Sequence, residues 1–220
     1  MADSRTWRRD LHELIFRTFF RVAAAGGAGG QTLVSRLYFG WLYRRPDPWK
    51  YASSPYELAK YERTLATLRG NCASRALEAG CSEGAFTEML LREGLARTIV
   101  GVDVSETALA RARARCAAFP GADFVRANVS SEAPSGSFDL IICAEILYYI
   151  GPRAGRACAI LGERLAPQGR LVAVHSTDRA ALLHAPWVAD PRLVHEQRIL
   201  ADDDARPYTI DVFRRVENGG

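Results

Sequence analysis

The chain has 220 residues, of which 48% are hydrophobic and 25% charged, as is ordinary for a soluble globular protein with one domain and a short addition. Its formal net charge of +4 comes from residues 1–50, where nine Lys and Arg stand against four Asp and Glu. The rest of the chain has no basic bias, which argues against nucleic acid as a partner.

Residues 7–22 form the first predicted element. Their apolar residues recur with nearly a 3.6-residue period, which predicts an amphipathic helix with arginines on its other face. We expect this helix to dock on the domain or to join two copies of the chain in a homodimer, and binding to a membrane surface is the alternative. Residues 23–30 are all Ala or Gly, which predicts a flexible linker.

Neither an export signal nor a membrane anchor is expected. Charged residues interrupt every apolar run of residues 7–22, so no signal-peptide core forms. No segment approaches the ~20 apolar residues of a membrane span. The five cysteines have neither a C-x-x-C pair nor metal-ligand spacing, which predicts reduced thiols and no metal site. Together these features predict a cytoplasmic protein.

Two further helices are expected before the first strand. The apolar stretch 33–43 predicts one helix, and Pro55, with Ser54 as its N-cap, opens another that runs to about residue 69. We therefore expect residues 1–45 to form an N-terminal helical extension and residues 46–220 to form the main domain.

From residue 75 onward, strands and helices alternate, which predicts an α/β domain with a doubly wound, mostly parallel sheet. Residues 176–191 give no clear pattern. The last two strands have no helix between them, so we expect an antiparallel C-terminal hairpin. The expected strands are 75–79, 98–103, 122–127, 138–144, 170–175, 192–201 and 207–216, and the helices are about 84–93, 105–117 and 152–165.

The turn after the strand at 75–79 carries two glycines. It reads Gly80-Cys-Ser-Glu-Gly84, and glycine lets a backbone approach a ligand where a side chain would collide. The next strand ends on Asp103, 23 residues after Gly80. At the carboxyl end of a strand in an open α/β sheet, such a carboxylate holds a ribose diol. The two features together predict a bound adenosine-type cofactor.

The spacing of this turn argues against a dinucleotide. A dinucleotide fold needs G-x-G-x-x-G and a helix N-terminus aimed at a pyrophosphate, and this turn lacks the middle and third glycines. Glu83 stands where the helix begins, and Glu78 stands just before the turn. These carboxylates would repel a pyrophosphate but attract an ammonium or sulfonium group.

The turn resembles motif I of the class I S-adenosylmethionine (SAM) methyltransferases, E-x-G-x-G-x-G, with Ser82 in place of the middle glycine. The resemblance implies a Rossmann-like sheet of seven strands with added N-terminal helices. It also implies that residues 46–220 are the methyltransferase domain. By the same resemblance, the methionine half of SAM is lined by Glu78, Gly80, Ser82 and Gly84, and the ribose is held by Asp103 beside Val104.

Two later strand ends complete the expected cofactor site. After the third strand, family members have an Asp and then an apolar residue that contact adenine, and here Asn128 and Val129 stand at these positions. The Asn128 side-chain oxygen can accept from an exocyclic amine. After the fourth strand, Ala144 begins a turn without the (D/N)-P-P-Y sequence that is typical of enzymes methylating nucleobase amines. A nucleobase acceptor is therefore not expected.

A closer resemblance lies in residues 46–61. Their P-W-x-Y…S-x-Y-E…K-Y string is similar to that of the nodulation N-methyltransferase (NodS-like) group, and the resemblance extends to about residue 175. It implies methyl transfer from SAM to an amine or hydroxyl of a small sugar-like or secondary-metabolite acceptor. Trp49, Tyr51 and Tyr56 are expected to close over SAM as a lid, since aromatic faces stabilise a cation.

Three residues near the fourth and fifth strand ends are candidates for catalysis. Glu145 and Tyr148 are placed to orient an amine acceptor and to take its proton through water. For a hydroxyl acceptor, His175 is the best-placed general base among the four histidines. His184 lies in residues 176–191, where the sequence has no clear secondary-structure pattern. We expect this segment to shape the acceptor pocket.

Two other functions stay open at this point. The first is a SAM-binding regulatory or scaffolding protein without transfer activity, because an intact cofactor motif does not guarantee catalysis. The second is a nicotinamide oxidoreductase, which would bind NAD.

Overall fold

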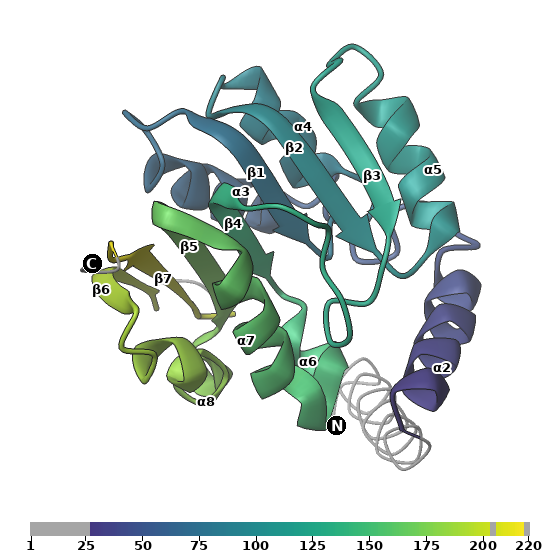
Figure 1. Ribbon diagram of the computed structural model, residues 1–220. Coiled ribbons are helices and arrows are strands. Elements are labelled where there is room, and N and C mark those ends of the chain that lie inside the picture. The colour runs from purple at the N-terminus through teal and green to yellow at the C-terminus, as the bar shows by residue number, and fades with distance from the viewer. Residues whose placement is uncertain (1–26, 203–205, 218–220) are drawn as a thin grey trace, which may run out of the picture.

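The computed structural model describes residues 27–202 and 206–217, which form one seven-stranded sheet with helices on both faces (Figure 1). The strand order is β3-β2-β1-β4-β5-β7-β6, with β1 to β5 parallel and β7 antiparallel between β5 and β6. The predicted doubly wound sheet with its antiparallel C-terminal hairpin is confirmed. The strands are β1 Ala73–Ala79, β2 Ala96–Asp103, β3 Ala122–Arg126, β4 Phe138–Ala144, β5 Leu165–Ser176, β6 Leu193–Ala201 and β7 Tyr208–Arg215.

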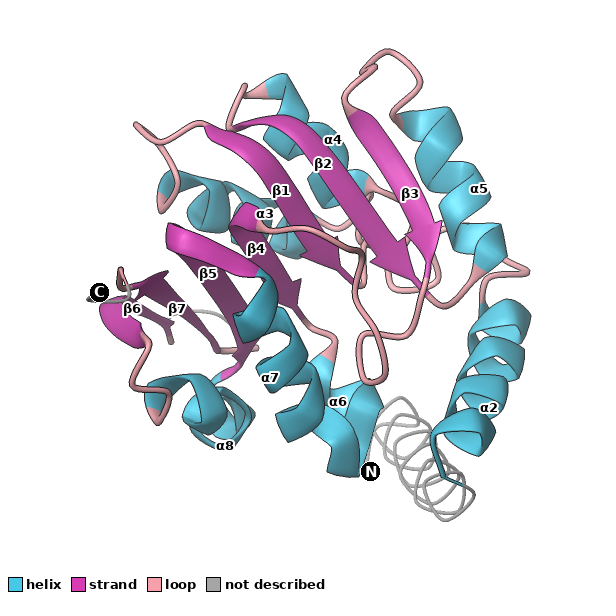
Figure 2. Cartoon of the chain, viewed as in Figure 1, coloured by secondary structure: helices cyan, strands magenta, loops and turns pink. Residues whose placement is uncertain are grey.

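The helices form two layers around the sheet (Figure 2). Helices α6, α7 and α8 pack on one face, α3 and α4 pack on the other, and α5 lies beside β3. The bounds are α2 Gly27–Leu42, α3 Pro55–Ala66, α4 Ala85–Arg92, α5 Glu106–Arg115, α6 Leu147–Ile150, the 3₁₀ turn Gly151–Arg153, α7 Ala154–Arg164 and α8 Thr177–Val188.

The central strands are apolar in nearly every position because they are covered on both faces. Successive side chains of a strand point to opposite sides of the sheet. On β5, Leu171 and Ala173 therefore belong to the core under α7 and α8, and Val172 and Val174 belong to the core under α3 and α4. This buried sheet fixes the positions of the strand ends, where the candidate site lies.

Two parts of the structure differ from the expectation. Residues 177–188 form α8, although no clear pattern was found there in the sequence, and Trp187 is buried with its Nε1 donating to Cys158 O (3.0 Å). Helix α2 begins at Gly27, so residues 27–30 are its first turn and not part of a linker. The predicted helix at 7–22, residues 23–26 of the predicted linker and residues 203–205 between β6 and β7 lie outside the described residues.

None of the helices in the described ranges has both the length and the apolar character that a membrane crossing requires. Within the same ranges, no group of three His, Cys, Asp or Glu side chains is arranged to hold a metal ion.

Candidate functional site

A cavity opens at the carboxyl ends of β1, β2 and β4, where an open parallel sheet binds its ligands. The volume of the cavity, including the solvent space at its opening, is about 1120 Å³. The walls come from these strand ends, from α2 and α3, and from the segment between those two helices. Of the predicted cofactor residues, Tyr51, Glu78, Gly80, Ser82, Asp103, Val104, Asn128, Val129 and Ala144 line it, whereas Tyr56 and Gly84 do not.

The glycine turn lies directly on this cavity. Gly80 has a φ of +78°, and a Cβ on it would lie 2.7 Å from the Cδ1 atom of Ile146, so a larger residue would collide as well as be strained. Gly84, with a φ of +75°, lies outside the cavity and packs against Ala112 of α5. Gly84 thus lets α4 and α5 approach each other, and its expected place along the methionine half of SAM stays a prediction.

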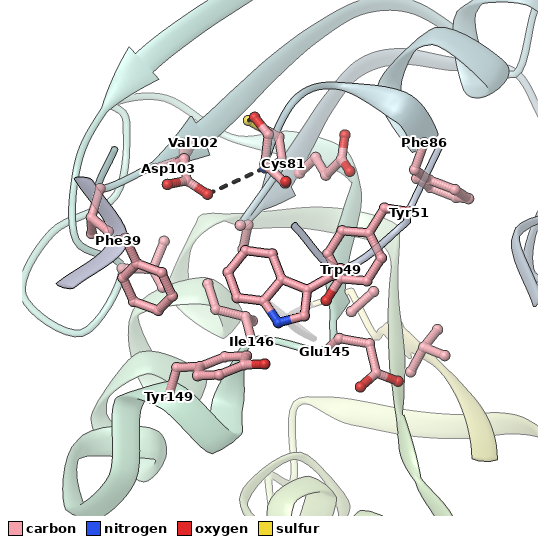
Figure 3. A pocket seen from close by; sticks show the side chains of 18 of the residues that line it. Phe39, Trp49, Tyr51, Cys81, Phe86, Val102, Asp103, Glu145, Ile146 and Tyr149 are labelled. Atoms are coloured by element: carbon pink, nitrogen blue, oxygen red, sulfur yellow. Dashed lines mark hydrogen bonds between the residues drawn. The ribbon is translucent and has the colours of Figure 1, made fainter. Parts of the chain in front are cut away.

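Asp103 points into the cavity from the end of β2 (Figure 3). Its Oδ2 accepts from the Ser82 N–H (3.2 Å) and its Oδ1 from the Ser105 N–H (2.8 Å). Burial raises its pKa to about 6, although these backbone donors act in the opposite direction. An ionised carboxylate has about four acceptor positions, so Asp103 can still accept from two hydroxyl groups.

Glu78 places a second carboxyl at the end of β1. The side chain is buried, and the Thr87 hydroxyl donates to its Oε2. Burial raises its pKa to about 8, the Thr87 hydrogen bond lowers it, and the nearby Asp103 raises it further. A cationic group in the cavity would favour the ionised form of Glu78.

Aromatic side chains form the opposite wall. Trp49 and Tyr51 are stacked at 15° with ring centroids 5.7 Å apart, and Tyr149 meets Trp49 edge-on at 6.1 Å (Figure 3). Phe39 of α2 lies 6.0 Å from Trp49. Trp49 and Tyr51 thus line the cavity, and these rings together cover that side of it, whereas their closing over SAM as a lid stays a prediction.

The segment that carries these rings is tied to the glycine turn. The Tyr43 hydroxyl donates to Ser82 Oγ (2.6 Å), and the Asp47 N–H donates to Glu83 Oε2 (3.0 Å). Glu83 also pairs with Arg111 of α5, at 2.5 Å. Glu83 therefore holds the segment in place and does not face the cavity.

Tyr56 does not belong to this wall. Its hydroxyl donates to Arg206 O, and its ring packs edge-on against Tyr208 at 6.0 Å. These contacts bind Tyr56 to the C-terminal hairpin, and its closing over the cofactor stays a prediction.

Asn128 lines the cavity, but its amide is already engaged. Its Oδ1 accepts from both the N–H (3.0 Å) and the hydroxyl (2.8 Å) of Ser130, and its Nδ2 donates to Thr32 of α2 (2.9 Å). Both lone pairs of the oxygen are thus used within the turn, and the acceptance of an exocyclic amine by Asn128 stays a prediction.

Glu145 lines the cavity directly after β4, with a φ of +55° that non-glycine residues rarely adopt. Its Oε1 lies 3.1 Å from Lys60 Nζ, which in turn lies 2.8 Å from Glu57 Oε2. Burial raises the pKa of Glu145, and the positive charge of Lys60 opposes this. Glu57 and Lys60 were not among the predicted site residues, although polar residues at 57, 60 and 64 share one face of α3 and all three are buried there.

Tyr148 and His175 lie behind Glu145 and outside the cavity lining. The Tyr148 hydroxyl lies beside Glu145 and accepts from the Ser176 N–H. His175 is fully buried, and its two ring nitrogens contact the Leu147 N–H (3.3 Å) and His184 (2.9 Å). As placed, neither nitrogen faces the cavity, which does not favour His175 as a base on the acceptor, and that role stays a prediction.

A family model matches more than half of the chain. The family model described as Nodulation protein S (NodS) matches residues 42–181. Nodulation protein S of Bradyrhizobium diazoefficiens is 37% identical over 130 residues, which are 57% of this chain and 61% of that protein. Nodulation protein S of Rhizobium tropici is 36% identical over 129 residues, which are 57% of this chain and 53% of that protein. The chain thus spans between about half and three fifths of the length of these curated relatives.

The fold has a counterpart among solved structures. The crystal structure of the N-methyltransferase NodS from Bradyrhizobium japonicum WM9, in complex with S-adenosyl-L-homocysteine, has a TM-score of 0.76 and 24% sequence identity. The likeness covers 83% of this chain and 99% of that chain. The two chains share the order and direction of the sheet described above.

Proposed function

This chain belongs to the Nodulation protein S (NodS) family, and from that membership we propose that it is a SAM-dependent methyltransferase acting on an amine of a small-molecule acceptor. One observation carries the proposal: the Gly80 turn, the Asp103 carboxylate and the buried Glu78 carboxyl face the same cavity at adjoining strand ends. That the NodS protein of similar fold is an N-methyltransferase supports an amine as the acceptor.

The residues of this cavity fit the proposed cofactor. SAM carries a ribose diol, an ammonium group and a sulfonium group, and the cavity offers a carboxylate at Asp103, a second carboxyl at Glu78 and an aromatic wall. Aromatic faces attract cations, and carboxylates hold hydroxyl and ammonium groups. When bound there, SAM supplies a methyl group on a positively charged sulfur.

The chain's own residues would orient the acceptor and hold its proton. Trp49, Tyr51 and Tyr149 exclude water from the reacting region, which strengthens electrostatic interactions there. Lys60 fixes the Glu145 carboxylate through their 3.1 Å ion pair. Glu145 then accepts a hydrogen bond from the amine and takes its proton, either directly or through one water molecule.

A hydroxyl acceptor fits less well. It would need a general base facing the cavity, and His175, the residue predicted for that task, is enclosed by Leu147 and His184. An amine that arrives neutral needs only to be oriented and to lose its proton afterwards. We therefore favour an amine on a sugar-like or secondary-metabolite compound.

Calorimetry followed by an acceptor screen tests this function. We expect the full chain to bind S-adenosylhomocysteine in isothermal titration, to show no thermal shift with NAD, and to methylate at least one compound in a panel of amines. Binding without any transfer would favour the regulatory or scaffolding protein, and a thermal shift with NAD alone would favour the oxidoreductase.

The affinity for S-adenosylhomocysteine is expected to rise about tenfold between pH 6.5 and 8.5. The pKa of Glu78 is raised to about 8, so this carboxyl is protonated in the free protein at the lower pH, and the ligand's ammonium group favours the ionised form. Titrations across this range measure the slope, which Glu78→Gln is expected to abolish. An equal slope in both proteins would contradict this role of Glu78.

The stability of the free protein is expected to change with pH in the opposite direction to its affinity for the ligand. Because the folded protein binds the Glu78 proton more tightly than the unfolded chain does, the stability linked to this group is fully present below pH ~4.5 and is lost as the pH rises through about 8. In the absence of ligand, a melting temperature that falls over this range in the wild type, and falls less in Glu78→Gln, is the expected result.

The partner, the location, the domain boundaries and the oligomeric state are further parts of the proposed function. We propose that the partner of the protein is a small-molecule acceptor and not a nucleic acid. We also propose that the protein is located in the cytoplasm. Residues 1–45 as an N-terminal extension, residues 46–220 as the methyltransferase domain, and a homodimer through the N-terminal helices stay predictions.

A further inference from the structure

We propose that His175, His184 and Asp211 form a positioning relay. It holds the turn that carries Glu145 in place from the face of the sheet that α8 covers. The three side chains come from β5, α8 and β7, and each is fully buried. The inference rests on the proposed function in one respect, namely that Glu145 meets the acceptor.

The relay is continuous from the turn to the C-terminal hairpin. The Leu147 N–H donates to His175 Nε2 (3.3 Å), His175 Nδ1 lies 2.9 Å from His184 Nε2, and His184 Nδ1 lies 2.7 Å from Asp211 Oδ2. Leu147 comes two residues after Glu145 and begins α6.

The positions of the protons follow from the first contact. A backbone N–H can only donate, so His175 Nε2 carries no proton and the proton of this ring is on Nδ1. His175 Nδ1–H must then donate to His184 Nε2, and His184 Nδ1–H must donate to the Asp211 carboxylate. Burial holds the pKa of His175 well below its usual value, so this ring is neutral at neutral pH. The relay therefore acts as a fixed support.

Asp211 anchors the far end. Its Oδ1 accepts from His195 Nε2 (2.8 Å) and Arg198 Nε (2.7 Å), and Arg198 Nη2 donates to its Oδ2 (2.8 Å). Burial alone would raise the pKa of Asp211, but the hydrogen bonds from His184 and Arg198 outweigh it and hold the pKa well below the usual value. Asp211 therefore stays ionised and fixed to β6.

The turn needs such support because it is strained and short. Glu145 has a φ of +55°, a conformation that persists in a non-glycine residue only when its surroundings hold it. Helix α6 has four residues, too few to be stable alone. Two backbone donors pin the turn to β5: the Glu145 N–H bonds to Val174 O (2.9 Å), and the Leu147 N–H bonds to His175. The second bond is the one that the relay supplies.

The test compares three variants of the full chain. His175→Leu removes the acceptor for the Leu147 N–H, and His175→Gln restores an acceptor. Leu171→Ala is the matched control, since Leu171 is equally buried on the same face of β5 but has no polar group that could take part in the relay.

Amide hydrogen exchange measured by NMR reports on the relay without needing activity. We expect the Leu147 amide to exchange at least tenfold faster in His175→Leu, relative to the amide of Ile141 in the centre of β4, and to be restored in His175→Gln. In Leu171→Ala this ratio is expected to stay unchanged. Unchanged Leu147 protection in His175→Leu would overturn the relay.

Two measurements decide what the relay does. With an amine acceptor found in the screen, we expect kcat of His175→Leu to fall about tenfold while the Kd for S-adenosylhomocysteine stays within about twofold. A faster Leu147 exchange with unchanged kcat and acceptor KM would overturn the positioning role. Imidazole ¹⁵N shifts of the wild type should show protons on Nδ1 of His175 and His184, and a proton on Nε2 of either ring would overturn the relay even if every variant failed to fold.

Failure of the proposed function is distinguishable from failure of the relay. If the wild type transferred no methyl group to any amine, the proposed function would be wrong, and the positioning role with it. The Leu147 exchange and the ¹⁵N shifts would still decide whether the three residues support the turn.

Discussion

Replacing Asp103 by alanine is expected to weaken the binding of S-adenosylhomocysteine by ~10²-fold or more, which corresponds to about 2.7 kcal/mol. Hydrogen bonds from a ligand to a charged group contribute about 1.5–3 kcal/mol each, and this carboxylate can accept two hydroxyl groups. The substitution also releases the Ser82 N–H, which orients the glycine turn. Both losses act on the cofactor site and in the same direction.

Isothermal titration of S-adenosylhomocysteine measures the effect, with two further variants for comparison. Asp103→Asn keeps one acceptor oxygen and is expected to bind with intermediate affinity. Asp123→Ala removes an exposed carboxylate at the other end of the sheet, where β3 begins, and is expected to bind as the wild type does. An unchanged dissociation constant for Asp103→Ala would remove the central support of the cofactor assignment.

The fold and the cofactor half of the site could be predicted because their signals are local in the sequence. Gly80 and Asp103 are separated by one helix and one strand, and each marks a strand end by itself. The direction of the sheet then brings those ends together. No contact between distant residues had to be known for this step.

The acceptor half could not be predicted in the same way. Lys60 and Glu145 are 85 residues apart and meet only because α3 packs over the ends of β4 and β5. The signal that was present, three polar residues on one face of α3, is typical of a solvated helix face. Burial of that face depends on the rest of the fold.

Helix α8 was missed for a related reason. Its buried residues are Ala180, Leu183, His184 and Trp187, which follow a helical period, but the apolar Leu182 and Val188 lie on its exposed side and mask that period in the sequence. Pro186 inside the helix obscured the pattern further. The relay through His184 was therefore beyond sequence analysis.

The hydrogen bonds of Asn128 within its own turn could have been predicted from the sequence. Asn side chains bond to the backbone two residues on, and Ser130 stands at that position. The local hydrogen bond competes with any ligand for the same oxygen. Side-chain chemistry at a turn has to be weighed against such a partner before a ligand is assigned.

Replacing Glu145 by glutamine is expected to lower kcat about 10²-fold while leaving the affinity for S-adenosylhomocysteine within about twofold. Glutamine keeps an oxygen that can accept from Lys60 Nζ, so the local structure is retained, but it cannot take a proton from the acceptor. Lys60 remains paired with Glu57 at 2.8 Å, so the substitution leaves no unpaired buried charge. The loss should therefore appear in the chemical step and not in folding.

Steady-state kinetics with an amine acceptor, together with calorimetry, separates the two roles that Glu145 can have. If the residue only anchors Lys60, glutamine would preserve turnover, because the acceptor oxygen is still present. If it holds the proton of the amine, turnover falls although binding persists. Glu132→Gln removes an exposed carboxylate in the loop between β3 and β4 and serves as the matched control, with unchanged kcat expected. A fall in both Glu145→Gln and the control would show that the effect does not depend on the position of Glu145 in the cavity.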